Sequence, residues 1–383
     1  MSNPESFLKR IEKLYSTLKP RPEKFSESVY PKEEVARDLT MLSTYQQSPE
    51  YQRGEERSDS VLLEKTFIHL SEVDDWFQEE DRFGDDENED YESIVAIPSS
   101  EVDDTFGHID VIGTIRNADT DYERMHFAID LTYNTDSEKL EKKFSWLHLH
   151  GLKDNAPKGV SEFGDIITDR GFDGRQHKRT RPLRNIFRRG LKIPGFASAK
   201  YYEDTNSTWD PAHDKGCIDV MPRLVVGYSP ELAEILAQGP PDESIARKYG
   251  MDEYEKRMND FNTAKTRAKW CALNECAEQA SAIHFMVDNL PESKTESMDK
   301  DELESARKQA AAMDKYFSGA LEQARKKAAE DPQEQEAMDY AERDEVRNEI
   351  QLRTGFTFID PYLKKKESVS SSQPGGSDEQ KIA

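Results

Sequence analysis

The sequence predicts an α/β protein, with a mixed central sheet flanked by helices and with mainly helical extensions on both sides. Five short apolar or β-branched runs predict strands, and they lie at residues 93–98, 108–115, 126–133, 197–202 and 223–227. Helix-start residues follow the third and the fifth run, at residues 134–137 and 229–230. Strands that alternate with helices in this way are typical of a sheet with helices packed on it.

The segment before the sheet has helical patterns of its own. Residues 5–18 place Phe7, Ile11 and Leu18 on one face, at the spacing of an amphipathic helix. Residues 33–43 and 61–77 also have helical character. We expect the 61–77 helix to cap the central sheet.

After the sheet, the pattern becomes entirely helical. Residues 252–288 carry apolar side chains at helical spacing. Residues 300–330 are rich in helix-favouring Ala, Glu, Lys and Arg but poor in large apolar residues. We therefore expect the 300–330 helix to pack weakly on one side or to project into solvent.

These patterns divide the chain into four parts. A helical segment with an acidic loop spans residues 1–92, and the α/β core spans residues 93–240. Residues 241–363 form a helical region, which is the expected surface for a protein partner. Residues 364–383 have the composition of a disordered tail.

Composition limits the function classes. The chain has 77 acidic and 53 basic residues, a formal net charge of −24, so its whole surface cannot wrap nucleic acid, although a local basic site is compatible with this charge. Cys217, Cys271 and Cys276 lack the spacing of a disulfide or zinc framework. No apolar run resembles a signal peptide or a membrane span. We expect a cytoplasmic protein without membrane contact.

Acidic residues within the strand-like runs are the features that point to chemistry. Asp110 lies in the second run and Asp130 in the third, after a predicted helical turn that holds Glu101 and Asp104. An Asp in an apolar run is costly unless it is paired or bound to a cation. Carboxylates that meet at neighbouring strand positions would suit Mg²⁺ or Mn²⁺. Alternatively, Asp110 and Asp130 bond to the backbone or to basic neighbours at the end of the sheet.

This arrangement resembles the PD-(D/E)XK nuclease-like superfamily, whose restriction-endonuclease-like core runs helix, three strands, helix, strand. The resemblance covers about residues 94–228. It implies that Glu101 or Asp104 takes the acidic helix position and that Asp110 is the second-strand Asp. Asp130 would be the first acid of the third-strand D/E-x-K motif. It further implies a phosphodiesterase in which a divalent cation held by Asp104, Asp110 and Asp130 activates a water molecule.

The motif departs from the family at its lysine position, which Thr132 occupies. In the family this lysine orients or activates the attacking water. Some members carry it on the following helix, where this chain has Lys139, Lys142 and Lys143, and we take Lys142 as the candidate catalytic lysine. Lys200 on a later strand is a further substitute. Without a replacement, the fold would be an inactive relative.

A strongly basic segment spans residues 170–192, with nine basic residues and one acidic residue and therefore a local net charge of +8. Such a segment can contact the phosphates of DNA or RNA through counterion release. The residues expected to do so are Arg175, Lys178, Arg179, Arg181, Arg184, Arg188 and Arg189. The alternative is that it pairs with the chain's own acidic run at residues 72–92, which holds twelve acidic residues and one basic residue.

Two functional hypotheses follow. The first is a metal-dependent nuclease, or a nucleic-acid-binding nuclease-like protein, which uses Asp110 and Asp130 for a divalent cation and residues 170–192 for phosphate contacts. The second is a catalytically inactive α/β scaffold for protein partners. Thr132 favours the second hypothesis, whereas the clustered acids and the adjacent basic segment favour the first.

Overall fold

The computed structural model describes residues 7–26, 29–47, 57–73, 76, 93–107, 109–116, 124–133, 195–203, 215–290, 295 and 299–343. The predicted helix after residue 134, the basic segment 170–192, most of the acidic run and the C-terminal tail lie outside these residues.

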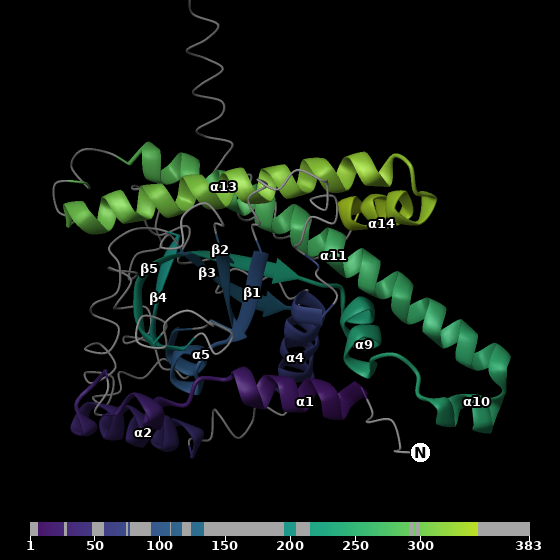
Figure 1. Cartoon of the computed structure of the whole chain (residues 1–383), viewed down its shortest axis with the longest axis horizontal. Coiled ribbons are helices and arrows are strands. Elements are labelled where there is room, and N and C mark those ends of the chain that lie inside the picture. Colours follow the sequence, from purple (N-terminus) through teal and green to yellow (C-terminus); the bar gives the residue numbers. More distant parts are fainter. Residues whose placement is uncertain are drawn as a thin grey trace, which may run out of the picture.

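Within this part of the chain, five strands form a mixed sheet of order β1-β2-β3-β5-β4 (Figure 1). The strands are β1 (Ser93–Pro98), β2 (Val111–Arg116), β3 (Arg124–Thr132), β4 (Phe196–Glu203) and β5 (Lys215–Gly227). The first three form an antiparallel meander, β5 runs parallel to β3, and β4 pairs antiparallel with β5. The predicted mixed sheet with flanking helices is confirmed, and all five predicted strands are present.

Helices precede and follow the sheet. They are α1 (Phe7–Leu18), the short 3₁₀ helix η1 (Pro22–Phe25), α2 (Lys32–Gln46), α4 (Arg57–Val73), α5 (Glu101–Gly107), α9 (Pro230–Gln238), α10 (Glu243–Tyr249), α11 (Met251–Asp288), α13 (Lys300–Ala328) and α14 (Pro332–Arg343). The predicted start of α9 is confirmed, because the Ser229 side chain accepts a hydrogen bond from the Leu232 amide. No helix among the described residues is long and apolar enough to span a membrane.

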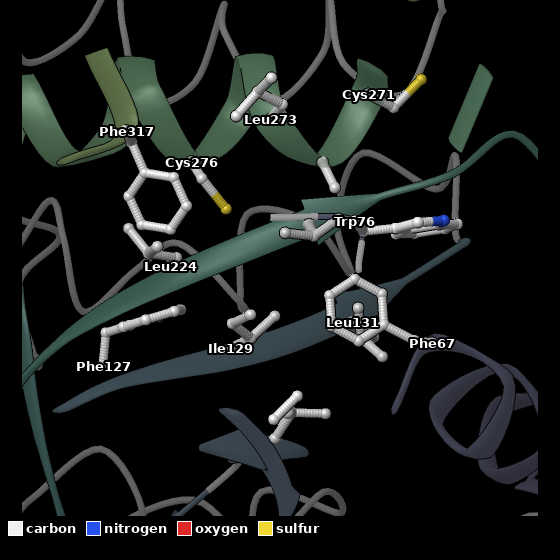
Figure 2. Close-up of a cluster of buried hydrophobic side chains, with 14 of the residues drawn as sticks. Phe67, Trp76, Phe127, Ile129, Leu131, Leu224, Cys271, Leu273, Cys276 and Phe317 are labelled. Carbon is white, nitrogen blue, oxygen red and sulfur yellow. The ribbon is translucent and has the colours of Figure 1, made fainter. Parts of the chain in front are cut away.

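One face of the sheet forms the main hydrophobic core, with α4, α11 and α13. Alternate side chains of β3, from Phe127 to Leu131, belong to this core together with Leu224 of β5. Figure 2 shows these side chains beneath Cys276 and Phe317 of the two long helices. The rings of Phe127 and Phe317 meet edge to face at 5.4 Å between centroids.

The expectation that residues 300–330 pack weakly or project into solvent was wrong. Helix α13 packs along α11 (Figure 1). It buries a continuous stripe that runs from Leu303 through Ala310 to Phe317. Several members of the stripe are alanines, whose small side chains let two helices approach closely, so the stripe is buried without many large apolar residues.

The opposite face of the sheet is concave and is filled by side chains from the strands themselves. A second buried cluster consists of residues from all five strands and of Ile109. Across it, the Tyr202 hydroxyl of β4 lies 3.1 Å from the Thr114 hydroxyl of β2. In a flat sheet, β2 and β4 would be separated by three strand spacings, about 14 Å. The β4 side of the sheet therefore curls over this concave face.

The curl begins where β5 changes partner. Up to Pro222, β5 pairs with β4, and from Arg223 onward it pairs with β3. β5 starts at Lys215 rather than at residue 223 as predicted. The added residues include a lysine, a glycine, an aspartate and a proline, and they become strand because β4 lies beside them.

Side chains of α11 complete the hydrogen bonding of β5 beyond its contact with β4. The Gln279 amide accepts a hydrogen bond from the Val225 N–H at 2.9 Å and donates one to the Val225 carbonyl at 2.6 Å. Glu275 accepts a hydrogen bond from the Gly227 N–H at 2.6 Å. These two side chains thus replace a neighbouring strand, and they fix α11 on the sheet.

Gln279→Ala should therefore destabilise the fold. Both backbone groups of Val225 would be left buried without these partners, which should lower the free energy of unfolding by about 2–4 kcal/mol. Urea unfolding measures the loss, and amide hydrogen exchange should become faster at Val225. Gln238→Ala, at an exposed side chain of α9, is the matched control and should change stability by less than about 0.5 kcal/mol. Equal effects of the two substitutions would contradict the assigned role.

Gly113→Ala tests the register of β2 on β3. Gly113 lies opposite Phe127, whose ring occupies the space that a Cβ would need. Because Phe317 holds that ring in place, the added methyl should cost about 1–3 kcal/mol. Gly319→Ala in α13, where a Cβ meets nothing within 4 Å, should instead stabilise the protein by about 0.5–1 kcal/mol. Thermal melts of the two variants should move in opposite directions.

Candidate functional site

Asp110 and Asp130 occupy facing backbone positions at one end of the β2–β3 pair. Asp110 immediately precedes β2, and its N–H donates to the Ile129 carbonyl at 3.0 Å. Because Val111 is opposite Ile129 in the antiparallel register, Asp110 stands opposite Asp130. The Asp110 carboxylate accepts a hydrogen bond from the Leu131 N–H at 2.6 Å. The backbone of β3 thus holds one of the two acids in place.

Asp130 forms a buried ion pair with Arg223. The Nη2 atom of Arg223 lies 2.8 Å from Oδ2 of Asp130, and the two side chains are only 5% and 4% exposed. Arg223 is the first residue of β5 to pair with β3, where it stands beside Ala128, diagonally across from Asp130. Neither charge could be buried at this depth without the other. Sequence reasoning did not single out Arg223, although a cation at the head of an apolar run is a signal for such a partner.

Glu64 of α4 is a further buried acid. It is 5% exposed, and its carboxyl accepts a hydrogen bond from the Tyr15 hydroxyl of α1 at 2.8 Å. Burial raises the pKa of Glu64 well above its ordinary value, and the negative charges of Asp104 and Asp110 raise that pKa further. Charges on α5 and on the residue before β2 thus act on a buried carboxyl group of α4.

Sequence reasoning missed Glu64, although a signal was present. Residues 61–77 were expected to form a helix, and Glu64 lies between Leu63 and Phe67 of its buried stripe. A carboxylate on the apolar face of a helix must find a partner or keep a proton. Here Tyr15 supplies the partner, and Lys19 in turn donates to the Tyr15 hydroxyl at 2.8 Å.

Other predicted site residues are engaged with α2. Glu101 accepts a hydrogen bond from the Gln46 side chain at 2.5 Å. Lys200, a suggested substitute for the motif lysine, forms ion pairs with Asp38 and with Glu34, the latter at 2.7 Å. Lys142 and the seven basic residues expected to contact phosphate lie outside the described residues.

Asp103, beside the predicted Asp104, has a structural role. It accepts hydrogen bonds from the Lys200 and Tyr201 amides of β4 at 2.8 and 3.0 Å. Ser100 caps α5 and donates to the same carboxylate at 2.7 Å. Burial raises the pKa of Asp103, and these hydrogen bonds oppose that rise. The Ser100-x-x-Asp103 spacing was the signal for this role in the sequence.

The described residues do not fit the expected Mg²⁺ or Mn²⁺ centre. Among them, no group of three or more His, Cys, Asp or Glu side chains is placed to hold a metal ion. Asp130 already has a guanidinium partner, and Asp110 has the Leu131 amide. The end of the sheet can hold a proton at Glu64 and an internal ion pair at Asp130, while the metal ion stays a prediction of the sequence.

Comparisons with protein-family models, with curated protein sequences and with solved structures found no significant match to this chain.

Glu64→Gln should stabilise the protein in a pH-dependent way. Because the folded-state pKa of Glu64 lies above its unfolded value, the wild type loses stability as pH rises through that interval, whereas the amide does not. The variant should match the wild type below about pH 4.3 and gain up to about 1.4 kcal/mol for each pH unit above it, until the folded pKa is reached.

Urea unfolding at a series of pH values measures this difference. Glu255→Gln, at an exposed side chain of α11, is the control and should show no such trend. A stability gap between Glu64→Gln and the wild type that stays constant from pH 4 to pH 8 would show that Glu64 is not held in a proton-favouring site.

Proposed function

We propose that this chain is a nuclease-like α/β protein that binds nucleic acid and does not cleave it. The Asp130–Arg223 ion pair is the observation that carries the proposal, because it lies at the first acid of the D-x-K-like motif and ties up that acid internally. The argument has three parts, which concern the architecture, the altered motif and the basic segment.

The order of elements supports the nuclease-like architecture. Helix α4 precedes the β1-β2-β3 meander, and β5 lies parallel to β3. Helix α4 also carries Glu64, a buried acid whose pKa is raised by burial and by the charges of Asp104 and Asp110. Glu64 thus suits the acidic helix position better than Glu101, which is bonded to α2. This placement removes the mismatch in element order that Glu101 and Asp104 present, since both follow β1.

The altered motif supports the absence of cleavage. Thr132 stands at the lysine position, and its neutral hydroxyl has no positive charge to offset the negative charge that develops on a phosphate. Arg223 holds Asp130 in a buried pair, so this acid is not open to solvent. Lys200, a candidate replacement, is paired with two carboxylates of α2. A guanidinium does not lower the pKa of a bound water as a metal ion does.

The position of the basic segment supports nucleic acid as the ligand. Residues 170–192 fall between β3 and β4, and the described residues on either side of the insertion both contact β5. The Thr132 carbonyl accepts a hydrogen bond from the Tyr228 N–H at 2.8 Å, and the Gly195 carbonyl accepts one from the Arg223 N–H at 2.9 Å. The described chain therefore stops and resumes beside β5 on either side of the insertion. The basic segment's charge of +8 would draw phosphate to an otherwise acidic chain.

A scaffold for protein partners is the second candidate function. Helix α10 has no buried residue, and Tyr249 and Met251, at the junction of α10 and α11, are 54% and 56% exposed. In Figure 1 this junction projects from the body of the protein. Exposed aromatic and Met side chains are common in protein-binding surfaces.

Electrophoretic mobility shifts with labelled DNA and RNA oligonucleotides test the proposal. We expect binding that weakens by about a thousand-fold between about 50 and 200 mM salt, as for a protein with several phosphate contacts. Replacing Arg175, Lys178, Arg179 and Arg181 by Ala should reduce the slope of log affinity against log salt by about 3–4. A variant with Arg325, Lys326 and Lys327 of α13 replaced by Ala loses almost as much charge and is the control, with a slope close to that of the wild type.

The same oligonucleotides, incubated with Mg²⁺ or Mn²⁺, test the absence of cleavage. Cleavage by the wild type that Asp130→Ala abolishes would overturn the non-cleaving proposal in favour of the metal-dependent nuclease. If no oligonucleotide binds at low salt, nucleic-acid binding is refuted and the scaffold function takes its place.

A further inference from the structure

We propose that the guanidinium of Arg223 is an internal replacement for a divalent cation at Asp130, and that removing it uncovers a cation site at Asp110 and Asp130. The inference rests on the nuclease-like architecture of the proposed function. It goes further, because it assigns the loss of the metal to one side chain and predicts that the loss can be reversed.

The geometry places Arg223 where a cation is needed. Asp110 and Asp130 stand opposite one another on neighbouring strands, and Arg223 reaches Asp130 from the strand on the other side of β3. The Nη2–Oδ2 distance of 2.8 Å is that of a charge-assisted hydrogen bond. Both side chains are at most 5% exposed, so the pair leaves an added ion no open path to this Asp130 oxygen.

The charge around the pair explains why a cation is required there. Asp110 stands opposite Asp130 in the register of β2 and β3, so two carboxylates share this end of the sheet. The Leu131 N–H gives Asp110 a hydrogen bond but no net charge. Several carboxyl groups at one end of a sheet are stable only if protons or positive charges offset them. Arg223 supplies one positive charge from within the chain.

The backbone of β5 holds Arg223 in place, so its positive charge stays at Asp130. Its N–H donates to the Gly195 carbonyl at 2.9 Å, and the next residues of β5 are held by Gln279 and Glu275 of α11. A guanidinium keeps its charge at every accessible pH. Unlike a metal ion, it does not dissociate and has no coordination position for a water molecule. A guanidinium in place of a metal ion thus preserves the fold but cannot support hydrolysis.

Thermal unfolding of four proteins with and without Mn²⁺ or Mg²⁺ tests the inference. They are the wild type, Arg223→Met, Arg223→Lys and the double variant Asp130→Asn/Arg223→Met. Methionine fills the volume of the arginine stem without charge, lysine keeps a charge, and the double variant removes both members of the pair. Arg267→Met, at an ion-paired arginine of α11, is the control for loss of a positive charge elsewhere.

We expect Arg223→Met to melt roughly 10 °C below the wild type in EDTA, because it leaves a buried carboxylate without its cation. Mn²⁺ at about one hundred times its Kd should restore roughly 5 °C of that loss. The wild type, Arg223→Lys, the double variant and the Arg267→Met control should be insensitive to either ion. If Arg223→Met is insoluble, its refolding yield from urea with and without Mn²⁺ replaces the melt, and it should rise in Mn²⁺ for this variant alone.

A cation effect in the wild type would overturn the inference, because the site would then be open despite Arg223. Equal cation effects in Arg223→Met and in the double variant would also overturn it, because binding would not involve Asp130. Neither outcome depends on nucleic acid. Mobility shifts of the same variants are expected to match the wild type, so a failure of the cation test can be distinguished from a failure of nucleic-acid binding.

Discussion

The backbone of β5 beyond Pro222 is the constraint on which the rest of the structure depends. Residues 223–227 pair with β3 on one side, but β4 no longer covers the other. Buried N–H and C=O groups without partners would cost more than a fold of this size can spare. Gln279 and Glu275 supply those partners. Helix α11 must therefore lie at this edge, and α13 and α14 pack against α11.

The same change of partner creates the polar end of the sheet. Arg223 is the first residue of β5 after the change, and it faces the concave side, where Asp130 lies. The preceding half of β5 carries β4 over that side, so that Tyr202 reaches Thr114. Asp130 thus lies at the end of an enclosed face, where desolvation makes an internal cation favourable. Burial and charge together hold Asp130 as one half of an ion pair.

The N-terminal helices complete this region rather than merely covering it. Helix α4 contributes Glu64, whose pKa the charges of Asp104 and Asp110 raise, and α1 contributes the tyrosine that hydrogen-bonds to it. Helix α2 takes up Glu101 and Lys200, which sequence reasoning had assigned to the site. Two groups of polar side chains therefore form where one was expected. One stabilises the acidic end of the sheet, and the other attaches α2 to α5 and β4.

The sequence by itself determined the strands and most helices, because alternating and helical apolar patterns are local properties. The bounds of β1 match the predicted run 93–98, and the cap at Ser229 was evident from two residues. Only the tertiary structure decided which charged groups meet. Arg223 and Asp130 are 93 residues apart in the chain, and Tyr15 and Glu64 are 49 apart. It likewise decided that α13 is buried and that β5 begins at Lys215. A neighbour that folding brings alongside determines both outcomes, and no local pattern contains that neighbour.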